Sequence, residues 1–493
     1  MLSIGYDIGS SSIKCSIINI EKGSVVSEGS YPSEEMEITS PKPNWAEQDP
    51  ELWWKYIKII TKDLIKKGSV KADEVVSIGL SYQMHGLVIV DKNQNVLRPS
   101  IIWCDSRAVQ IGNNAFEAIG KQKCLSNLLN SPGNFTASKL RWVRENEPDV
   151  YKNIHKAMLP GDYIAMKLSG EINTTYSGLS EGIYWDFKEN QLSKDVLSYY
   201  DIDENILPAP NNTFSVQGKL TKQAAEELGL KEGIVISYRA GDQPNNAFSL
   251  NVLNPGEIAA TGGTSGVVYG ITEKVNYDSL SRVNQFAHVN YSKENTRLGV
   301  LLCINGTGIQ YSWMRKNTGT NLSYSEINKL IEKVPIGSEG LIAIPFGNGA
   351  ERMLENKNTN AHILGIDFNR HSHPHLFRSI QEGIAFSFKY GMDIMRDMGL
   401  KMDVIRASKA NMFLSPTFRQ TLSNITGATI ELYDTNGSQG AARGAAVGAG
   451  YYKSFKEAFT NLTLLETVKP EEKDLEVTKN FYQNWYEQLK KFL

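Results

Sequence analysis

A chain of 493 residues is too long for one ordinary hydrophobic core, so we expect two or three domains. Lys and Arg number 52 and Asp and Glu 54, which leaves a net charge of −2 without any block of like charges. This balance argues against nucleic acid or an anionic membrane surface as the main partner. The four cysteines are scattered, which argues against a disulfide framework or a zinc ribbon.

The N-terminal sequence enters a strand pattern directly, without a basic segment or a long apolar core. We therefore expect no signal peptide. No apolar run approaches the length that spans a bilayer. Together with the scattered cysteines, these features predict a protein of the reducing cytoplasm.

The first strand pattern, residues 4–8, meets a turn of small residues at 9–12, and a second strand pattern follows over 13–20. Asp7 lies where the first strand meets this turn. The backbone amides of a Gly/Ser turn can hold phosphate oxygens, and a nearby carboxylate can bind the magnesium that accompanies them. A plain surface hairpin is the alternative interpretation.

A second hairpin pattern repeats the first about half a chain later. Residues 258–269 again predict a strand, a turn rich in Gly, Ser and Thr, and a strand. The turn at 261–266 corresponds to residues 7–12. Two such hairpins indicate duplicated domains that face one another. A cleft between them would hold a polyphosphate from both sides.

Met84 and His85 lie on a loop between two strand patterns. Ligands tend to bind at strand ends in α/β sheets. Met84 could form an apolar floor and His85 could hydrogen-bond a hydroxyl, whereas a purely structural histidine is the alternative. Further along, Asp105 and Arg107 could form a simple ion pair in a turn.

Asp242 follows an apolar strand pattern at a predicted helix start, with Pro244 in the first turn. Asp242 could simply cap this helix, because aspartate caps and proline in the first turn are common. The two hairpins and the loop at Met84 make a functional carboxylate the competing interpretation.

Three histidines alternate at His371, His373 and His375, which could place metal ligands on one strand face. Pro374 and the apolar spacing after it favour a helix start instead, and nothing nearby supplies a fourth ligand. A run of small residues at 437–450 predicts a helix whose surface allows close approach by another backbone or by a flat ring.

Taken together, these stretches resemble the FGGY family of carbohydrate kinases over nearly the whole chain, from Tyr6 to about Gly450. The most specific pieces are residues 47–50, 83–86, 241–243 and 440–442. The resemblance implies an α/β fold of two actin-like, ribonuclease-H-like domains, each a mixed β-sheet flanked by helices, around a central cleft. It implies an N-terminal sugar-binding domain, a C-terminal nucleotide-binding domain and a C-terminal helical tail, over residues 1–250, 256–450 and 451–493.

The same resemblance implies phosphorylation of D-xylulose by ATP with Mg²⁺. Asp242 would be the general base that takes the proton from the sugar hydroxyl, and Asp7 would bind the magnesium at the phosphates. Sugar contacts are expected from Met84, His85, Trp103, Asp105 and Gln243. Nucleotide contacts are expected from Asp7, Ser10, Ser11, Ser12, Lys14, Gly263, Thr264, Gly306, Ala410 and Asn411.

The chain departs from the family pattern at Ser10, where Thr is usual, and at Cys104, where Asn is common. At Ala410-Asn411-Met412 the family usually has a glycine-rich nucleotide loop, and side chains there would restrict backbone approach to adenosine.

Three alternatives to a xylulose-specific enzyme stay open or are weighed against it. The sugar could be another ketose or polyol, such as ribulose, fuculose, gluconate or glycerol. An actin- or chaperone-like ATPase would use the same hairpins without a sugar, but it leaves the loop at Met84 unexplained. A metal hydrolase would depend on the three histidines. A homodimer is the first oligomer to consider, because dimers are common among such enzymes.

Overall fold

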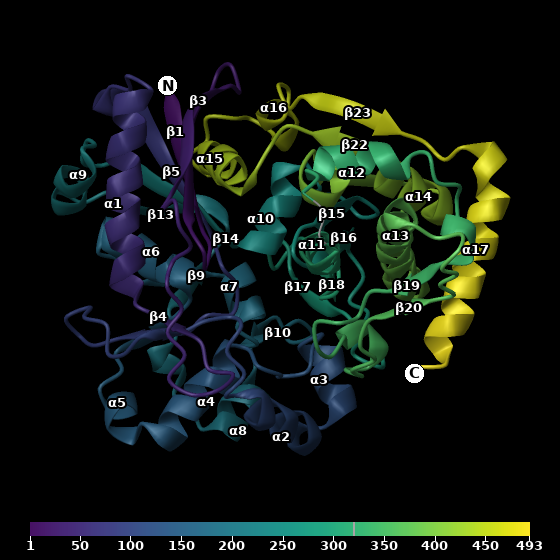
Figure 1. Cartoon of the computed structure of the whole chain (residues 1–493). Helices are drawn as coiled ribbons and strands as arrows, with labels where there is room; N and C mark the ends of the chain where they lie inside the picture. The colour runs from purple at the N-terminus through teal and green to yellow at the C-terminus, as the bar shows by residue number, and fades with distance from the viewer. Residues whose placement is uncertain (319–320) are drawn as a thin grey trace.

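The computed structural model describes residues 1–318 and 321–493. Two bodies lie side by side, each built on one β-sheet with helices against it (Figure 1). The first sheet, in spatial order, consists of β13 (Phe214–Lys219), β14 (Val235–Gly241), β5 (Val75–Tyr82), β1 (Leu2–Ile8), β2 (Ile13–Asn19) and β3 (Val25–Tyr31). The second consists of β17 (Asn284–Ala287), β18 (Leu298–Ile304), β16 (Gly266–Thr272), β15 (Ile258–Gly262), β21 (Val404–Ser408), β22 (Thr429–Tyr433) and β23 (Leu464–Val468).

The two sheets share one topology. In the first, β3, β2 and β1 pair antiparallel, β1, β5 and β14 pair parallel, and β14 and β13 pair antiparallel. The second sheet has the same order of pairings: β18, β16 and β15 pair antiparallel, β15, β21 and β22 pair parallel, and β22 and β23 pair antiparallel. The additional strand β17 pairs antiparallel with β18 at the edge. The hairpins β1–β2 and β15–β16 occupy equivalent places, in agreement with the internal repeat that their turns predict.

The burial of the strands explains their sequence patterns. The central strand β1 is covered on both faces, so nearly all of its residues are buried. The edge strand β3 is mostly exposed and carries polar residues between its valines and tyrosine. A strand covered on both faces has no polar side, and this is why residues 2–8 read as almost continuously apolar or small.

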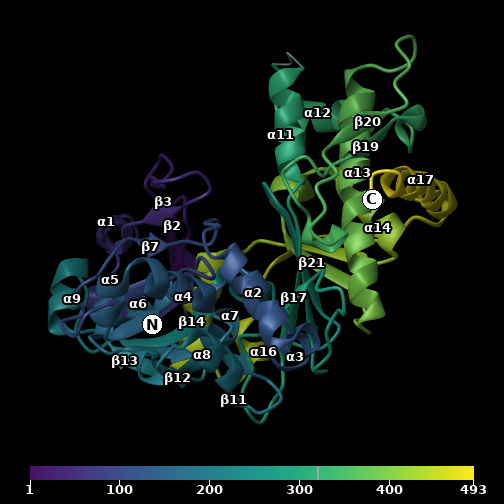
Figure 2. The same cartoon turned by 90° about the horizontal axis from the view of Figure 1, so that it is seen from below.

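Helices on both faces of each sheet complete the two bodies. On the first sheet, α1 (Pro50–Lys67) packs against β2 and β3, with α6 (Pro160–Ser169) and α9 (Lys222–Leu228) beside it. In the second body, α13 (His373–Asp397) contacts β16 and β18, and α14 (Pro416–Thr426) and α17 (Glu472–Lys490) lie outside it. Figure 2 shows the same two groups from below. The expected pair of mixed sheets flanked by helices is confirmed.

The remaining elements are short. The helices are α2 (Val109–Ile119), α3 (Lys121–Asn127), α4 (Thr136–Asn146), α5 (Pro148–Lys152), α7 (Tyr176–Glu181), α8 (Lys194–Tyr200), α10 (Asp242–Ser249), α11 (Gly308–Asn317), α12 (Tyr324–Ile331), α15 (Gly437–Gly448) and α16 (Phe455–Ala458). Two-stranded pairs are β4 (Glu47–Gln48) with β7 (Ser100–Ile101), β6 (Val88–Val90) with β8 (Lys156–Met158), β9 (Asn173–Thr175) with β12 (Ala209–Asn211), β10 (Trp185–Asp186) with β11 (Gln191–Leu192), and β19 (Ile342–Ile344) with β20 (His362–Leu364).

The predicted small-residue helix is α15, and it lies on the first sheet although it comes late in the chain. A Cβ atom added to Gly5 would stand 2.0 Å from the carbonyl oxygen of Ser438, and one added to Gly79 would stand 2.1 Å from that of Ala441. Glycine on the strands and small residues on α15 therefore permit backbone contact. The close surface serves helix-to-sheet packing rather than a flat ring.

The three alternating histidines belong to a helix start. α13 begins at His373, with Pro374 in its first turn, and the backbone N–H of Ser372 donates to Nδ1 of His375 at 3.2 Å. Among the described residues, no group of three His, Cys, Asp or Glu side chains could hold a metal ion. The helix interpretation of this stretch is confirmed.

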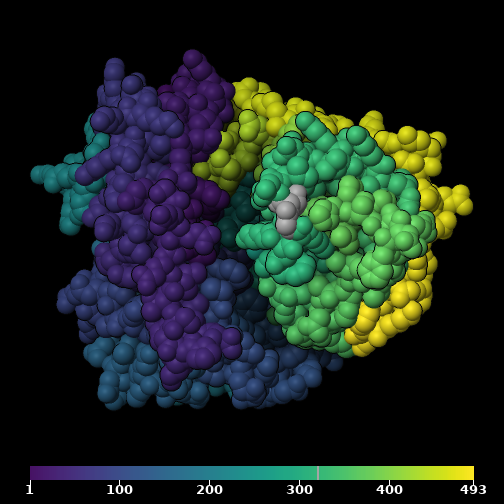
Figure 3. Space-filling view, viewed as in Figure 1, coloured from purple at the N-terminus to yellow at the C-terminus, as the bar shows by residue number. Residues whose placement is uncertain are grey.

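A groove separates the two bodies on the face seen in Figure 3, with residues of both halves of the chain on its walls. No helix within residues 1–318 and 321–493 is long and apolar enough to cross a membrane.

Replacing Gly79 by Ala should lower the free energy of unfolding by roughly 1–3 kcal/mol, because the added methyl group meets the α15 backbone. The matched control is Gly29→Ala in β3, where the nearest atom to the new methyl is 3.4 Å away, on the flexible side chain of Leu64. Thermal or denaturant unfolding of both variants measures the difference. Equal losses would contradict the close helix-to-sheet contact.

Candidate active site

Three parallel strands of the first sheet end at one edge, and each delivers polar side chains there. Asp7 stands near the end of β1, Ser81 near the end of β5, and Asp242 directly after β14. Ser81 Oγ donates to Asp7 Oδ1 at 2.8 Å. The carboxyl edge of a parallel sheet is where α/β proteins place ligands, so this edge is the candidate site.

Asp242 begins the helix α10, but the cap is one residue earlier than predicted. Gly241 is the N-cap, and Asp242 is the first helical residue. Burial and the nearby charge of Asp7 raise the pKa of Asp242 to about 7, against the opposing effects of hydrogen bonds with Gln243 and the charge of Lys14. The two carboxyl groups therefore face a common space, and Asp242 can exchange a proton near neutral pH.

The turn after β1 brings predicted nucleotide contacts, such as Ser10, next to a predicted sugar contact, Trp103. It closes through a hydrogen bond from the Gly9 N–H to the Ser12 carbonyl oxygen at 3.1 Å. Ser10 Oγ accepts a hydrogen bond from Trp103 Nε1 at 3.3 Å. Trp103 is 53% exposed, so its ring stands open beside the turn. Lys14 Nζ lies 4.0 Å from Asp7 Oδ2. Ser11 is exposed at the tip.

The loop at Met84 and His85 lies next to this edge. Met84 is buried, and His85 adopts a left-handed backbone conformation with φ of 63°. The His85 ring packs against Phe135 and against Phe286 of the second body, with ring centroids 4.6 and 5.3 Å apart. Burial, followed by the charges of Lys139 and Arg352, lowers the pKa of His85 to about 3. His85 is therefore neutral at physiological pH.

A neutral histidine can serve as a hydrogen-bonding group for a hydroxyl. His85 Nδ1 lies 3.1 Å from the carbonyl oxygen of Glu181. Among the described residues, no hydrogen bond to Nε2 is found. The ring is therefore held by one nitrogen, and the other is available to a ligand.

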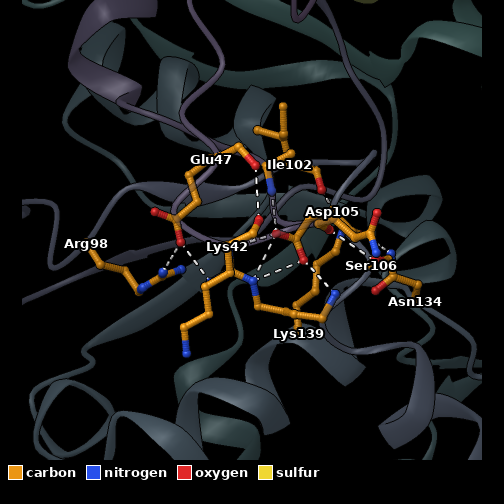
Figure 4. A network of polar contacts seen from close by, with 12 residues as sticks. Lys42, Glu47, Arg98, Ile102, Asp105, Ser106, Asn134 and Lys139 are labelled. Carbon is orange, nitrogen blue, oxygen red and sulfur yellow. Dashed lines mark hydrogen bonds and ion pairs between the residues drawn. The ribbon is translucent and has the colours of Figure 1, made fainter.

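A network of buried charges fixes the loops that carry His85 and Trp103 (Figure 4). Lys139 Nζ donates to the carbonyl oxygens of His85 at 2.8 Å and of Ile102 at 3.0 Å. Both loops therefore depend on one ammonium group, and burial lowers the pKa of Lys139 to about 7.

Asp105, a predicted sugar contact, belongs to the same network. Its carboxylate is buried and accepts two hydrogen bonds from Arg107 Nε, one from Arg107 Nη2 and one from the Ala46 N–H. Arg107 also pairs with Glu47 at 2.7 Å, and Glu47 pairs with Arg98 at 2.5 Å. Both oxygens of Asp105 thus accept hydrogen bonds within the protein, so the structure gives this residue a role in holding the loop, and the sugar contact stays a prediction.

On the second body, the equivalent turn is fastened to the start of α11. The Gly308 N–H donates to the Gly263 carbonyl oxygen at 3.0 Å, and the Ile309 N–H donates to that of Thr264 at 3.1 Å. Thr264 is exposed. This turn is therefore rigid but open, as a phosphate-binding turn must be.

Gly306 stands where no side chain fits, because a Cβ atom there would lie 1.8 Å from the Pro345 carbonyl oxygen. The N–H groups of Gly306 and Asn305 both donate to the carboxyl group of Glu351, at 3.1 and 3.0 Å. Burial raises the pKa of Glu351 to about 7. The Gly306 N–H is therefore bound to Glu351, and the nucleotide contact expected of Gly306 stays a prediction.

Ala410 and Asn411 are exposed beside the second turn. Asn411 has φ of 51°, in the left-handed region that asparagine tolerates better than other side chains. A Cβ atom on Gly263 would lie 3.7 Å from Asn411 Nδ2, so the two predicted nucleotide segments meet. Asparagine here keeps the backbone conformation for which glycine is the usual residue.

Three buried residues at the site were missed by sequence reasoning: Glu181, Lys139 and Glu351. Lys139 alone left a signal, since it interrupts the buried face of α4 between Ala137 and Leu140. The two glutamates are ordinary residues in their local sequence. Their partners are distant along the chain, and this is why no local pattern reveals them.

Family models match most of the chain. The N-terminal domain model of the FGGY family of carbohydrate kinases matches residues 2–249, and the C-terminal domain model matches residues 258–452. The chain belongs to the FGGY family of carbohydrate kinases. It is therefore a sugar phosphotransferase, and the resemblance stated from the sequence is confirmed.

Relatives match over nearly the whole length. Xylulose kinase of Bacillus subtilis is 28% identical over 463 residues, which is 92% of this chain and 89% of that protein. Xylulose kinase of Escherichia coli is 28% identical over 478 residues, 95% and 94% of the two chains.

Solved structures show the same fold. A xylulose kinase from Rhodospirillum rubrum has a TM-score of 0.88 and 23% identity, and it covers 99% of this chain and 98% of its own. Gluconate kinase from Lactobacillus acidophilus, at 21% identity, and Plasmodium falciparum glycerol kinase with ADP, at 20%, give the same TM-score and coverage. The fold is thus shared by kinases named for different substrates.

Replacing Arg107 by Met should destabilise the protein by about 3–5 kcal/mol, because Asp105 would be left as an unpaired buried carboxylate and Glu47 would keep only its pair with Arg98. The control is Lys121→Met, which breaks an exposed ion pair with Glu117 and should change stability little. Denaturant unfolding compares the two. A loss no larger than that of the control would contradict the structural role of Asp105.

Proposed function

We propose that this FGGY kinase transfers the terminal phosphoryl group of ATP to a hydroxyl of D-xylulose, giving xylulose 5-phosphate. The observation that supports it is the meeting of Asp7, Asp242 and the His85 loop at one edge of the first sheet. The relatives named xylulose kinase support the choice of sugar. The first body would bind the sugar, the second would bind the nucleotide, and a cytoplasmic location follows from the use of ATP.

Asp242 is the proposed general base. A sugar hydroxyl is a weak nucleophile, so a carboxylate that accepts its proton as the new bond forms assists the attack. Its raised pKa, about 7, makes it a stronger base than an exposed aspartate while leaving much of it ionised at neutral pH. The charge of Asp7 contributes to this value, so the two carboxyl groups act together electrostatically.

The phosphates are proposed to lie between the two turns. Ser10 to Ser12 with Lys14 would contact them from the first body, and Gly263 with Thr264 would do so from the second. Ala410 and Asn411 would border the nucleoside.

Asp7 fits a magnesium ion, since one of its oxygens is already oriented by Ser81, and the other, among the described residues, has Lys14 at 4.0 Å as its one ion-pair partner. Magnesium, when bound, would neutralise negative charge on the phosphates.

The sugar is proposed to lie over Met84, with His85 Nε2 and Gln243 as hydrogen-bonding partners. The exposed ring of Trp103 would cover an apolar face of the sugar. Closure of the two bodies would exclude water, which otherwise competes with the sugar for the phosphoryl group. A kinase for another ketose or for a polyol is the second candidate, because gluconate and glycerol kinases share the fold equally well.

Phosphorylation of xylulose, ribulose, fuculose, gluconate and glycerol should be compared by coupled ADP release, with kcat/KM as the measure. We expect xylulose to give the highest value. The Asp242→Asn variant, prepared in parallel, should lose turnover while still binding the sugar, and it controls for contaminating kinases. A higher kcat/KM for another substrate would replace xylulose, and near-normal turnover by the variant would exclude Asp242 as the base.

The pH dependence should report the ionisation of Asp242. Below its pKa of about 7 the group is protonated and cannot accept the sugar proton, so kcat/KM should fall about tenfold per pH unit. Lys14→Met removes a cation that stabilises the carboxylate, so this limb should move to higher pH. The matched control is Lys22→Met on the neighbouring hairpin, which should leave the limb in place. A limb unmoved by Lys14→Met would contradict the assignment.

A further inference from the structure

Glu181, the last residue of α7, lies between the loop that carries His85 and the end of β14, directly before Asp242. Its Oε1 accepts a hydrogen bond from the His85 N–H at 3.2 Å, and its backbone carbonyl oxygen contacts His85 Nδ1 at 3.1 Å. Its Oε2 accepts from the Tyr82 hydroxyl at 3.3 Å. A Cβ atom on Gly241 would lie 2.6 Å from this oxygen. One side chain thus touches both the His85 loop and the residue before Asp242.

The surroundings of Glu181 disfavour a charge. The side chain is fully buried and, among the described residues, it has no ion pair. Arg239, on the neighbouring strand β14, is paired with Asp162 at 3.0 Å. Burial, with the charges of Asp162 and Asp242, raises the pKa of Glu181 well above its usual value. Tyr82 and Tyr269, which also face it, are neutral at physiological pH. A lone buried carboxylate is costly, so the carboxyl group is held protonated.

His85 needs such support, because its left-handed backbone conformation is unfavourable for a residue with a side chain. Two of the contacts that hold this conformation come from Glu181, and Lys139 supplies a third through the His85 carbonyl oxygen. Without Glu181, the His85 N–H would be a buried donor with no described partner.

The helix that carries Glu181 also contacts the second body. The Ala287 N–H of β17 donates to Ser180 Oγ at 2.9 Å, and the neighbouring Phe286 packs against the His85 ring. The end of α7 therefore contacts both the loop that carries His85 and strand β17. His85 is placed relative to both bodies by one short segment.

We propose that Glu181 is a positioning residue for the sugar: its uncharged carboxyl group fixes His85 relative to Asp242. This inference rests on the proposed function of the same site. Glutamine should replace it well, since an amide oxygen can accept from the His85 N–H and an amide N–H can donate to the Tyr82 hydroxyl. Alanine removes both contacts.

The experiment compares Glu181→Gln, Glu181→Ala and Tyr82→Phe with the native enzyme, using whichever sugar of the panel the native enzyme phosphorylates best. Glu181→Ala should raise the sugar KM about tenfold, the effect of one lost buried hydrogen bond, and leave the ATP KM unchanged. Glu181→Gln and the control Tyr82→Phe, which leaves the bond to His85 intact, should stay within about threefold of native. A native sugar KM in Glu181→Ala, or an equal rise in Glu181→Gln, overturns the proposal.

The pH profile tests the charge separately. If Glu181 is uncharged, Glu181→Gln leaves the acidic limb of Asp242 where it is. If Glu181 carries a charge, its removal stabilises the Asp242 carboxylate and moves the limb to lower pH, which overturns the proposal.

A measurement without substrate keeps this test independent of the proposed function. The ring resonances of His85 in the histidine-labelled, sugar-free protein, assigned with His85→Gln, should shift in Glu181→Ala and remain in Tyr82→Phe. Unchanged resonances in Glu181→Ala overturn the positioning role, whichever sugar is the substrate. If Glu181→Ala does not fold, the His85 ring resonances are measured in Glu181→Gln instead. We expect them to be unchanged there, and a shift of the ring signal would count against the proposal.

Discussion

Parallel pairing of β1, β5 and β14 is the constraint on which the candidate site depends. Parallel strands end at the same edge, so residues from positions 7, 81 and 242 become neighbours although they are far apart in the chain. The two carboxyl groups that meet there repel one another, and this repulsion adds to burial in raising the pKa of Asp242. The same edge positions the Met84–His85 loop, which follows β5 directly. The proposed chemistry therefore depends on the strand order, which brings these side chains together, as well as on the type of each side chain.

Close backbone packing supports this edge from behind. α15 approaches β1 and β5 at a distance that glycine on the strands permits, and β14 at one that its own Gly444 and Gly448 permit; its first residue, Gly437, stands against Asp7. The helix comes from the segment that follows β22, so the late part of the chain completes the first body as well as the second. Duplication of the sheet topology gives each body an equivalent hairpin, and the two turns can then approach one polyphosphate from opposite sides.

Three buried acids near the site show how environment decides the role of a carboxyl group. Asp105 is matched by Arg107 and is structural. Asp242 has no ion pair within the described part of the chain and feels the charge of Asp7, so it can gain and lose a proton near neutral pH. Glu181 is buried with no ion pair to any residue that the structure describes, and its pKa lies well above the usual range. These residues are chemically alike in the sequence. The neighbouring groups, and not the residue type, decide that Asp105 anchors a loop, that Asp242 is the proposed base and that Glu181 is the proposed positioning residue.

The sequence by itself determined what depends on local pattern. The hairpin turns, the helix start at Pro374, the small-residue helix and the family membership all rest on residues close together in the chain. Only the tertiary structure decided where α15 packs, that Asp105 is occupied by Arg107, and that Glu181 supports His85. Asp105 and Arg107 are neighbours, yet whether a turn pair faces a ligand or a buried network depends on Glu47 and Ala46, more than 50 residues away. Contacts across such separations are selected by the packed fold as a whole, and they leave no periodicity or spacing in the sequence from which they could be inferred.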